Sequence, residues 1–208
     1  MNLGLIVVDM QNAFCHPEGS MRRIGLKTQP LRAPIAAIAK LIETARAAKV
    51  IVIFTRYVYR SDYADGGILI KELFPQIKEV SGLRAGTWDV EVIDELKPAP
   101  GEFVIDKNRY SAFFKTSLED VLRESVVDTL MIVGVTTSMC VESTARDAHF
   151  RDYRVWIVRE ATAEIDAQRH ESALATIEFG FGRVIGCEDA CRRILENAAT
   201  NTNQEAAS

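Results

Sequence analysis

Short apolar runs alternate along the chain with segments in which apolar residues recur every three or four positions. The runs are rich in β-branched residues, and most are apolar throughout, which is typical of strands covered on both faces of a sheet. They lie at residues 3–8, 50–55, 103–105, 129–135, 155–158 and 182–185. The periodic segments predict helices at residues 34–49, 116–124, 138–151 and 168–180.

The order of these elements indicates the fold. Strands that alternate with helices form parallel sheets, because each helix returns the chain to the same edge of the sheet. We therefore expect an α/β protein with a doubly wound, three-layer fold, a mainly parallel six-stranded sheet and helices on both faces. Residues 1–197 are expected to form one domain, and the small and polar residues 198–208 a disordered C-terminal tail.

Composition and charge narrow the classes of function. The net charge is −4 and no run of Lys or Arg exceeds two residues, so a nucleic-acid partner is not expected. No apolar stretch approaches the roughly 20 residues of a membrane helix, and no secretory signal is recognisable, so we expect a cytoplasmic protein without a membrane partner. The four cysteines and three histidines are not spaced as a zinc site, and no metal or cofactor is expected.

Three reactive side chains follow predicted strands directly. Asp9 comes after the first strand, Lys107 after the third and Cys140 after the fourth. Ligands of such sheets bind beyond the carboxyl ends of the strands, so these side chains are expected to converge there. An unpaired charge at the end of an apolar strand would be costly, which also favours convergence of Asp9 with Lys107.

Cys140 lies where a strand gives way to a helix. The unpaired N–H groups of a helix N-terminus favour a thiolate and can stabilise an oxyanion. In this interpretation Asp9 takes the thiol proton and returns it to the departing amine, while Lys107 keeps the carboxylate ionised and favours the thiolate. The alternative is that Cys140 is a small buried apolar side chain, as free cysteines often are.

Three stretches of the sequence resemble the isochorismatase-like cysteine hydrolases. They read LIVVDMQNAF, VIDKNRYSAFFKTSLEDVLR and LMIVGVTTSMCVESTARDAHFRDY, and the resemblance runs from about residue 3 to about residue 189. It implies a doubly wound α/β domain with Asp9, Lys107 and Cys140 as catalytic triad. It also implies a cis peptide bond between Val135 and Thr136, and an oxyanion hole made by the amides of Thr136 and Cys140.

The resemblance further implies amide hydrolysis. It is greatest to family members that cleave ureidoacrylate and carbamoyl amides, in the stretches GTWDVEVIDELKPAPGEFVIDKNRYSAFF and CVESTARDAHF. Metal-dependent nicotinamidases of the family carry histidines after the second strand, where this chain reads TRYVYRSDYADGG. We therefore expect a metal-free hydrolase that cleaves a C–N bond of a small amide or ureide through a thioester, releasing ammonia or an amine. Vinyl ether hydrolysis of the isochorismatase type, and metabolite binding without catalysis, are the alternatives.

Five side chains are candidates for substrate binding: Gln11, Phe14, Arg56, Trp88 and Tyr110. Arg56 is expected to bind a substrate carboxylate through its fork of donors. The alternatives are packing in the core or a lid for Phe14 and Trp88, a tie between loops for Gln11, and a surface ion pair for Arg56. Residues 56–88 are expected to form loops over the site, and family members commonly form dimers or tetramers, which implies a homo-oligomer.

Overall fold

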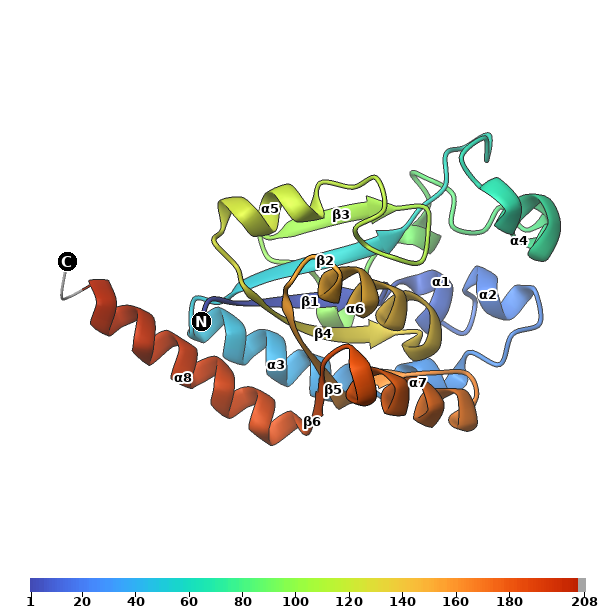
Figure 1. Ribbon diagram of the computed structural model, residues 1–208. Coiled ribbons are helices and arrows are strands. Elements are labelled where there is room, and N and C mark those ends of the chain that lie inside the picture. The colour runs from blue at the N-terminus through green and yellow to red at the C-terminus, as the bar shows by residue number, and fades with distance from the viewer. Residues whose placement is uncertain (206–208) are drawn as a thin grey trace.

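Six parallel strands form a single sheet (Figure 1). The computed structural model describes residues 1–205, with side chains up to residue 199. The strands are β1 (Leu3–Val8), β2 (Ile51–Tyr57), β3 (Phe103–Lys107), β4 (Thr129–Val135), β5 (Arg154–Ala163) and β6 (Arg183–Ile185). Their spatial order is β3-β2-β1-β4-β5-β6, and every pairing is parallel. The predicted doubly wound α/β fold is thus confirmed, with its change of winding direction between β1 and β4.

Helices cover both faces of this sheet, and each helix buries one apolar stripe. On one face lie α5 (Leu118–Glu124), α6 (Glu142–His149) and α7 (Ala167–Gly180); on the other lie α3 (Ile35–Ala47) and α8 (Cys187–Glu205). In α3 the buried positions are Ile38, Leu41, Ile42 and Ala45, which follow the helical repeat. Burying an Ile or Leu side chain stabilises the fold by about 1.5–3 kcal/mol, so these stripes hold the helices on the sheet.

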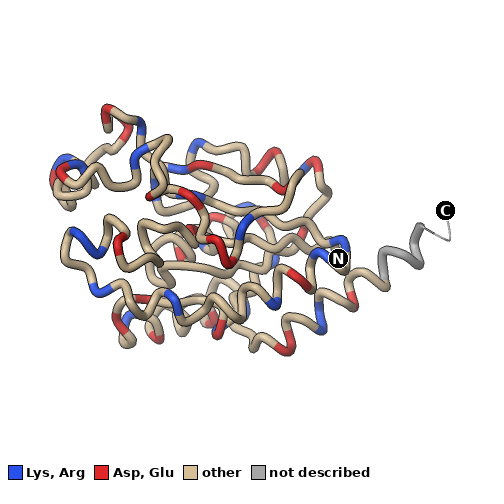
Figure 2. Tube along the Cα trace, turned by 180° about the vertical axis from the view of Figure 1, so that it is seen from behind, with Lys and Arg blue, Asp and Glu red and all other residues tan. Residues whose placement is uncertain are grey.

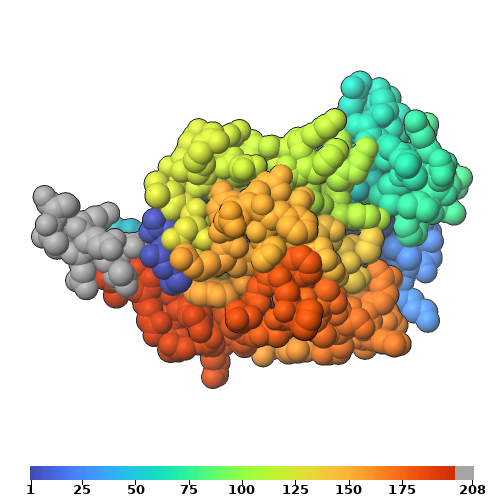
Figure 3. All heavy atoms as spheres, viewed as in Figure 1, coloured from blue at the N-terminus to red at the C-terminus, as the bar shows by residue number. Residues whose placement is uncertain are grey.

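Short helical turns lie along the connections between these elements. They are α1 (Asn12–Cys15), α2 (Ser20–Arg23), η1 (Gln29–Arg32), η2 (Leu69–Leu73), α4 (Gln76–Glu79), η3 (Trp88–Val90), η4 (Asp94–Leu96) and η5 (Thr137–Val141). The turns α1, α2 and α4 lie beyond the carboxyl ends of the strands, at the right of Figure 1. In Figure 3 the segment that carries η2 and α4 projects at that end of the molecule. The loops predicted for residues 56–88 therefore lie on the side where a ligand would bind.

The largest differences from the predicted elements lie in the second half of the chain. Regular helix after β4 begins at Glu142 rather than at residue 138, because Thr137–Val141 form a π-helical turn. Strand β5 continues to Ala163, past the exposed Arg159 and Glu160 that interrupt its apolar run. The apolar pattern does not predict α8, because the only fully buried apolar side chains of this helix within the described residues are Ala190 and Ile194. Residues 198–205 of the expected tail continue α8, and residues 206–208 lie outside the described part of the chain.

Charged residues of both signs are interspersed along the chain (Figure 2). None of the helices among residues 1–205 combines the length and the apolar character needed to cross a bilayer.

Candidate active site

Asp9 follows β1 directly and is completely buried. Its φ of +52° lies in the left-handed region, so the chain turns sharply away from the sheet at this residue. Such a conformation is uncommon for a residue other than glycine and is found frequently at functional sites. The hydroxyl of Thr55, on the neighbouring strand β2, donates a hydrogen bond of 2.7 Å to Asp9 Oδ1. One carboxylate oxygen is thereby fixed, and Oδ2 faces the Lys107 ammonium.

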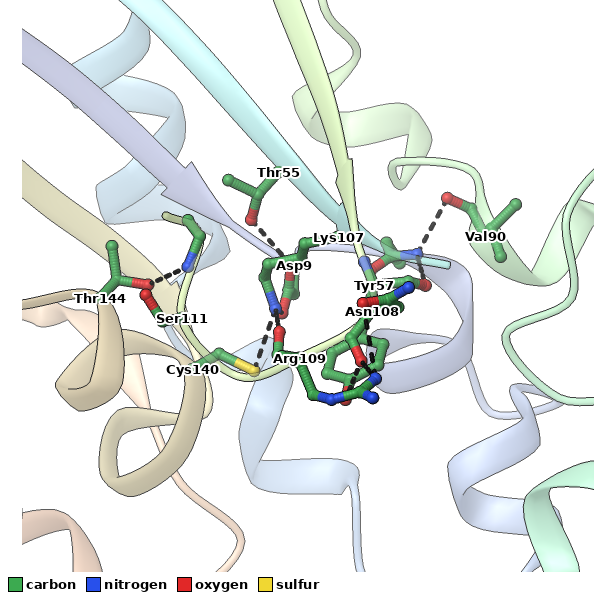
Figure 4. Close-up of polar contacts among 12 residues, drawn as sticks. Asp9, Thr55, Tyr57, Val90, Lys107, Asn108, Arg109, Ser111, Cys140 and Thr144 are labelled. Carbon is green, nitrogen blue, oxygen red and sulfur yellow. Dashed lines mark hydrogen bonds and ion pairs between the residues drawn. The ribbon is translucent and has the colours of Figure 1, made fainter. Parts of the chain in front are cut away.

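Lys107 terminates β3 and bridges Asp9 and Cys140 (Figure 4). Its Nζ lies 2.6 Å from Asp9 Oδ2 and donates to Cys140 Sγ at 3.3 Å. Because β2 separates β3 from β1, the two strands lie about 10 Å apart, and the long lysine side chain and the Asp9 carboxylate bridge this gap together. Nζ also lies 4.3 Å from the centre of the Tyr57 ring, and it donates a hydrogen bond of 3.1 Å to the carbonyl of Arg109.

Cys140 lies in η5, immediately after β4, and is 4% exposed. The peptide bond between Val135 and Thr136 at the start of this turn is cis. Just before it, Gly134 has a φ of +113° and packs so closely on β1 that a Cβ would lie 2.1 Å from the carbonyl oxygen of Val8. Only glycine fits there, because both the backbone conformation and the close approach exclude a side chain. The turn that carries Cys140 is thus held against the strand that carries Asp9.

Two side chains from the far end of β5 and from α7 hold the η5 turn. Glu164 Oε2 accepts hydrogen bonds from the backbone N–H and the hydroxyl of Ser138, at 3.0 and 2.7 Å. The Thr137 hydroxyl lies 2.8 Å from Nδ1 of His170. These contacts satisfy polar groups at the N-terminal end of the turn, where backbone donors lack partners within the helix.

Burial dominates the protonation of the site. It is the largest influence on the Cys140 thiol and raises its pKa well above the ordinary range; Lys107 opposes this effect and the Asp9 carboxylate adds to it. For Lys107, burial lowers the pKa, but the charge of Asp9 and the Cys140 sulfur outweigh it, so the pKa is raised. Both directions favour the protonated forms of Lys107 and Cys140, and the lysine charge acts as expected, since it lowers the pKa of the thiol against the larger effect of burial.

A cavity of about 180 Å³ opens above the sulfur. Cys140 and Thr136 line it, together with two of the predicted substrate-binding residues, Phe14 and Tyr110. Within the described residues, no cluster of three or more His, Cys, Asp or Glu side chains is arranged to hold a metal ion.

The other three predicted binding residues do not line this cavity. The Gln11 side chain is fully buried and ties loops together, because its amide donates to the carbonyls of Tyr57 and Val90 and accepts from the Tyr57 N–H. Arg56 forms ion pairs with Asp106 at 2.7 Å and Glu91 at 3.6 Å, which occupy its donors.

Trp88 is half exposed and contacts the edge of the His16 ring. Gln11, Arg56 and Trp88 thus make structural contacts, namely a tie between loops, surface ion pairs and ring packing.

The sequence pattern does not single out Glu164 and Arg169, although both line the cavity. Glu164 follows β5 directly, as Asp9 follows β1, so the same rule finds it once the strand end is known. The strand predicted from the sequence ends at residue 158, so Glu164 is not recognised there as a residue that follows a strand.

Comparisons with known proteins identify the family of this chain. Residues 4–189 match the family model described as Isochorismatase domain. The chain is 34% identical to the ureidoacrylate amidohydrolase RutB of Rhizobium rhizogenes, over 94% of this chain and 85% of that protein. Among solved structures it is similar to a cysteine hydrolase from Pseudomonas syringae pv. phaseolicola, with a TM-score of 0.87, 34% identity and coverage of 94% and 93% of the two chains. It is also similar to N-carbamoylsarcosine amidase from Thermoplasma acidophilum, with a TM-score of 0.73, 29% identity and coverage of 90% and 97%.

The family model covers most of the chain, and the strand order and sequence stretches agree with it. The chain therefore belongs to the isochorismatase-like cysteine hydrolases.

Proposed function

We propose that this protein is an amidohydrolase in which Cys140 attacks the carbonyl carbon of a small amide or ureide. The observation that carries the proposal is the position of Lys107 Nζ, 2.6 Å from Asp9 Oδ2 and 3.3 Å from the Cys140 sulfur, below a cavity that the sulfur lines. The names of two relatives, a ureidoacrylate amidohydrolase and an N-carbamoylsarcosine amidase, support cleavage of a C–N bond.

The first half-reaction forms a thioester. As the sulfur attacks the carbonyl carbon, the thiol proton passes to the Asp9 carboxylate, which acts as general base. Burial raises the pKa of the Cys140 thiol, so the mechanism assigns Asp9 to take its proton. The Lys107 ammonium stabilises the negative charge that develops on sulfur, and the N–H groups of Thr136 and Cys140 stabilise the carbonyl oxyanion. The C–N bond then breaks, and the leaving nitrogen takes the proton from Asp9.

The second half-reaction restores the enzyme. A water molecule loses a proton to Asp9 as it attacks the thioester carbon, and the C–S bond breaks. The proton on Asp9 returns to the Cys140 sulfur. A ureide would release ammonia and a carbamate, and a carboxamide would release ammonia and a carboxylate. In both cases Phe14 and Tyr110 are placed to contact the rest of the substrate.

Ammonia release combined with intact-protein mass spectrometry tests the proposal. A panel of small carboxamides and ureas is incubated with the protein, and reactions are quenched in acid within the first turnover. We expect ammonia release and a mass increase located on Cys140 for the same compounds. Cys140→Ala should abolish both signals, since it removes the sulfur that carries the acyl group in this mechanism.

Cys191→Ala is the matched control, because Cys191 lies on α8 and is only partly buried. It should retain ammonia release and the adduct. Turnover of a vinyl ether without any adduct, and with activity retained in Cys140→Ala, would instead support hydrolysis of the isochorismatase type. Binding of a compound without turnover would support a non-catalytic relative.

A further inference from the structure

The wall of the cavity above Cys140 is almost entirely apolar. It is built by the short elements beyond the carboxyl ends of the strands, namely α1, α2, η2 and α4 and their connections (Figures 1 and 3). The side chains that these elements contribute include Phe14, Met21, Ile24, Leu69, Phe74 and Ile77. A substrate group that enters this space leaves water and gains contacts with carbon atoms, which stabilises an apolar group and penalises a charged one.

The charged side chains on this wall, among the described residues, are Glu164 and Arg169. Both are already engaged. Glu164 is buried and accepts from the N–H and hydroxyl of Ser138 and, at 2.9 Å, from the N–H of Ile165. Arg169 is exposed, and its Nη2 donates to the Ser138 hydroxyl at 2.9 Å. Both side chains share the Ser138 hydroxyl, and Arg169, for which no ion pair is found among the described residues, lies at an exposed position of the lining.

Two cations at the carboxyl ends of the strands are already paired. Lys107 pairs with Asp9 below the sulfur, and Arg56 pairs with Asp106 and Glu91 away from the cavity. A substrate carboxylate placed against Phe14 and Met21 would exchange water for side chains that offer no hydrogen-bond donor, which is strongly unfavourable.

The size of the cavity suits a compact hydrocarbon group. An apolar protein cavity of about 150 Å³ takes up benzene, and this cavity measures about 180 Å³. It therefore has room for a substituent of about six carbons.

We propose that the substrates of this site are neutral carboxamides or N-substituted ureas whose substituent is apolar, with the reactive carbonyl at Cys140 and the substituent against the α1, α2, η2 and α4 wall. This inference rests on the amidohydrolase function proposed above and narrows its substrate class. It distinguishes the site from one built for substrates with a remote carboxylate.

Two matched substrate series test the inference, with ammonia release as the readout. Unbranched carboxamides from acetamide to hexanamide, and the corresponding N-alkylureas, measure the effect of chain length. We expect kcat/KM to rise about fourfold for each added methylene until the cavity is filled. Within the carboxamides, succinamate replaces the terminal methyl of butanamide with a carboxylate, and adipamate does so for hexanamide. Each should react about a hundredfold more slowly, or worse, than its neutral partner.

Phe74→Ser tests the wall itself. Phe74 lines the cavity and is 38% exposed, so its replacement leaves no large internal void and the protein should fold. The increase in kcat/KM per methylene should become clearly smaller in this variant. Phe179→Ser is the matched control, because Phe179 is 95% exposed and does not line the cavity. It should leave the dependence on chain length unchanged.

The outcomes separate this inference from the proposed function. If acetamide and longer amides react equally well, or if succinamate and adipamate are preferred and lose that preference in Arg169→Gln, the apolar substrate class is wrong while the hydrolase function stands. If no amide or urea of either series releases ammonia and Cys140 acquires no adduct, the hydrolase function itself is wrong.

Discussion

Lys107 is the residue on which the geometry of the site depends. Its ammonium is completely buried, and it pairs with a carboxylate that is also completely buried. Each charge alone would be destabilising in this environment, since desolvation of an ion costs several kcal/mol. Together with the hydrogen bond from Thr55 to Asp9, the pair satisfies both charges and places a cation against sulfur. The same interaction therefore supports the fold and, in the proposed mechanism, stabilises the charge that develops on sulfur.

Replacement of Lys107 by methionine should destabilise the protein as well as inactivate it. The substitution keeps most of the side-chain volume but leaves the Asp9 carboxylate buried without its cation, which is expected to lower the free energy of unfolding by about 3–5 kcal/mol. Urea unfolding followed by circular dichroism measures this change. In the double variant Asp9→Asn/Lys107→Met no buried charge remains, so most of the stability should return while activity stays absent.

Arg46→Met provides the control for the lysine variant. Arg46 pairs with Glu102 at 2.8 Å on the surface, and such pairs contribute up to about 1 kcal/mol. Equal unfolding midpoints for Lys107→Met and the unaltered protein would contradict the role assigned to the buried pair.

At the scale of elements, the connection from β4 to α6 decides where the thiol lies. The register between β4 and β5 shifts between Ile132 and Gly134, so the end of β4 is irregular. Gly134 then approaches Val8, and the π-helical turn η5 follows in place of an ordinary helix start. Glu164 and His170 hold that turn from β5 and α7. The position of the Cys140 side chain thus depends on β4, η5, β5 and α7 together.

Gly134→Ala should disturb this connection strongly. The added Cβ would lie 2.1 Å from the Val8 carbonyl oxygen, in a backbone conformation that alanine rarely adopts. We expect a loss of about 3 kcal/mol or more in the free energy of unfolding, together with loss of ammonia release, because β1 and β4 must separate.

Gly101→Ala is the matched comparison in urea unfolding. Gly101 also has a positive φ, of +90°, but no atom lies within 4 Å of the position of an added Cβ. The cost there should be confined to the backbone, about 1 kcal/mol. Similar losses in both variants would show that close packing of Gly134 on β1 is unimportant.

At the scale of the whole molecule, the strand order brings distant segments to one edge. The winding direction changes between β1 and β4, and in sheets of this kind the ligand crevice lies at that point. Asp9 and Cys140 follow the two strands that border the change, while Lys107 reaches it across β2. The expected homo-oligomer is a property of the assembled molecule and stays a prediction.

Two buried thiols should make the free energy of unfolding fall as the pH rises into the alkaline range. Burial raises the pKa of Cys15 to about 12, and it raises the pKa of Cys140 as well. Above about pH 8.5 the unfolded chain releases these protons and the folded protein keeps them, so stability present at lower pH is lost as the pH rises. Between pH 9 and 10 each thiol should contribute a loss of about 1.4 kcal/mol per pH unit.

Urea unfolding at several pH values measures this slope. Cys140→Ala should make it shallower by about the contribution of one proton. Cys191→Ala, at a partly buried position on α8, should leave a steeper slope than Cys140→Ala. An identical slope in Cys140→Ala and in the unaltered protein would mean that Cys140 is not a neutral buried thiol.

The amino-acid sequence by itself determined the layers of the fold and the residues of the candidate triad. Apolar runs such as 3–8 and 129–135 are buried along their whole length, and this property is local enough to be recognised from composition and spacing. The placement of Asp9, Lys107 and Cys140 after such runs followed from the rule that parallel strands end at one edge.

Only the tertiary structure decided the distances, the protonation of the thiol and the character of the cavity. Arg56 could not be separated from a substrate ligand in the sequence, because its partner Asp106 becomes its neighbour only when β2 pairs with β3. The raised pKa of Cys140 arises from burial by many segments at once, and the apolar wall combines short turns far apart in sequence. Such properties depend on which residues surround a group in space, and a linear pattern does not contain that information.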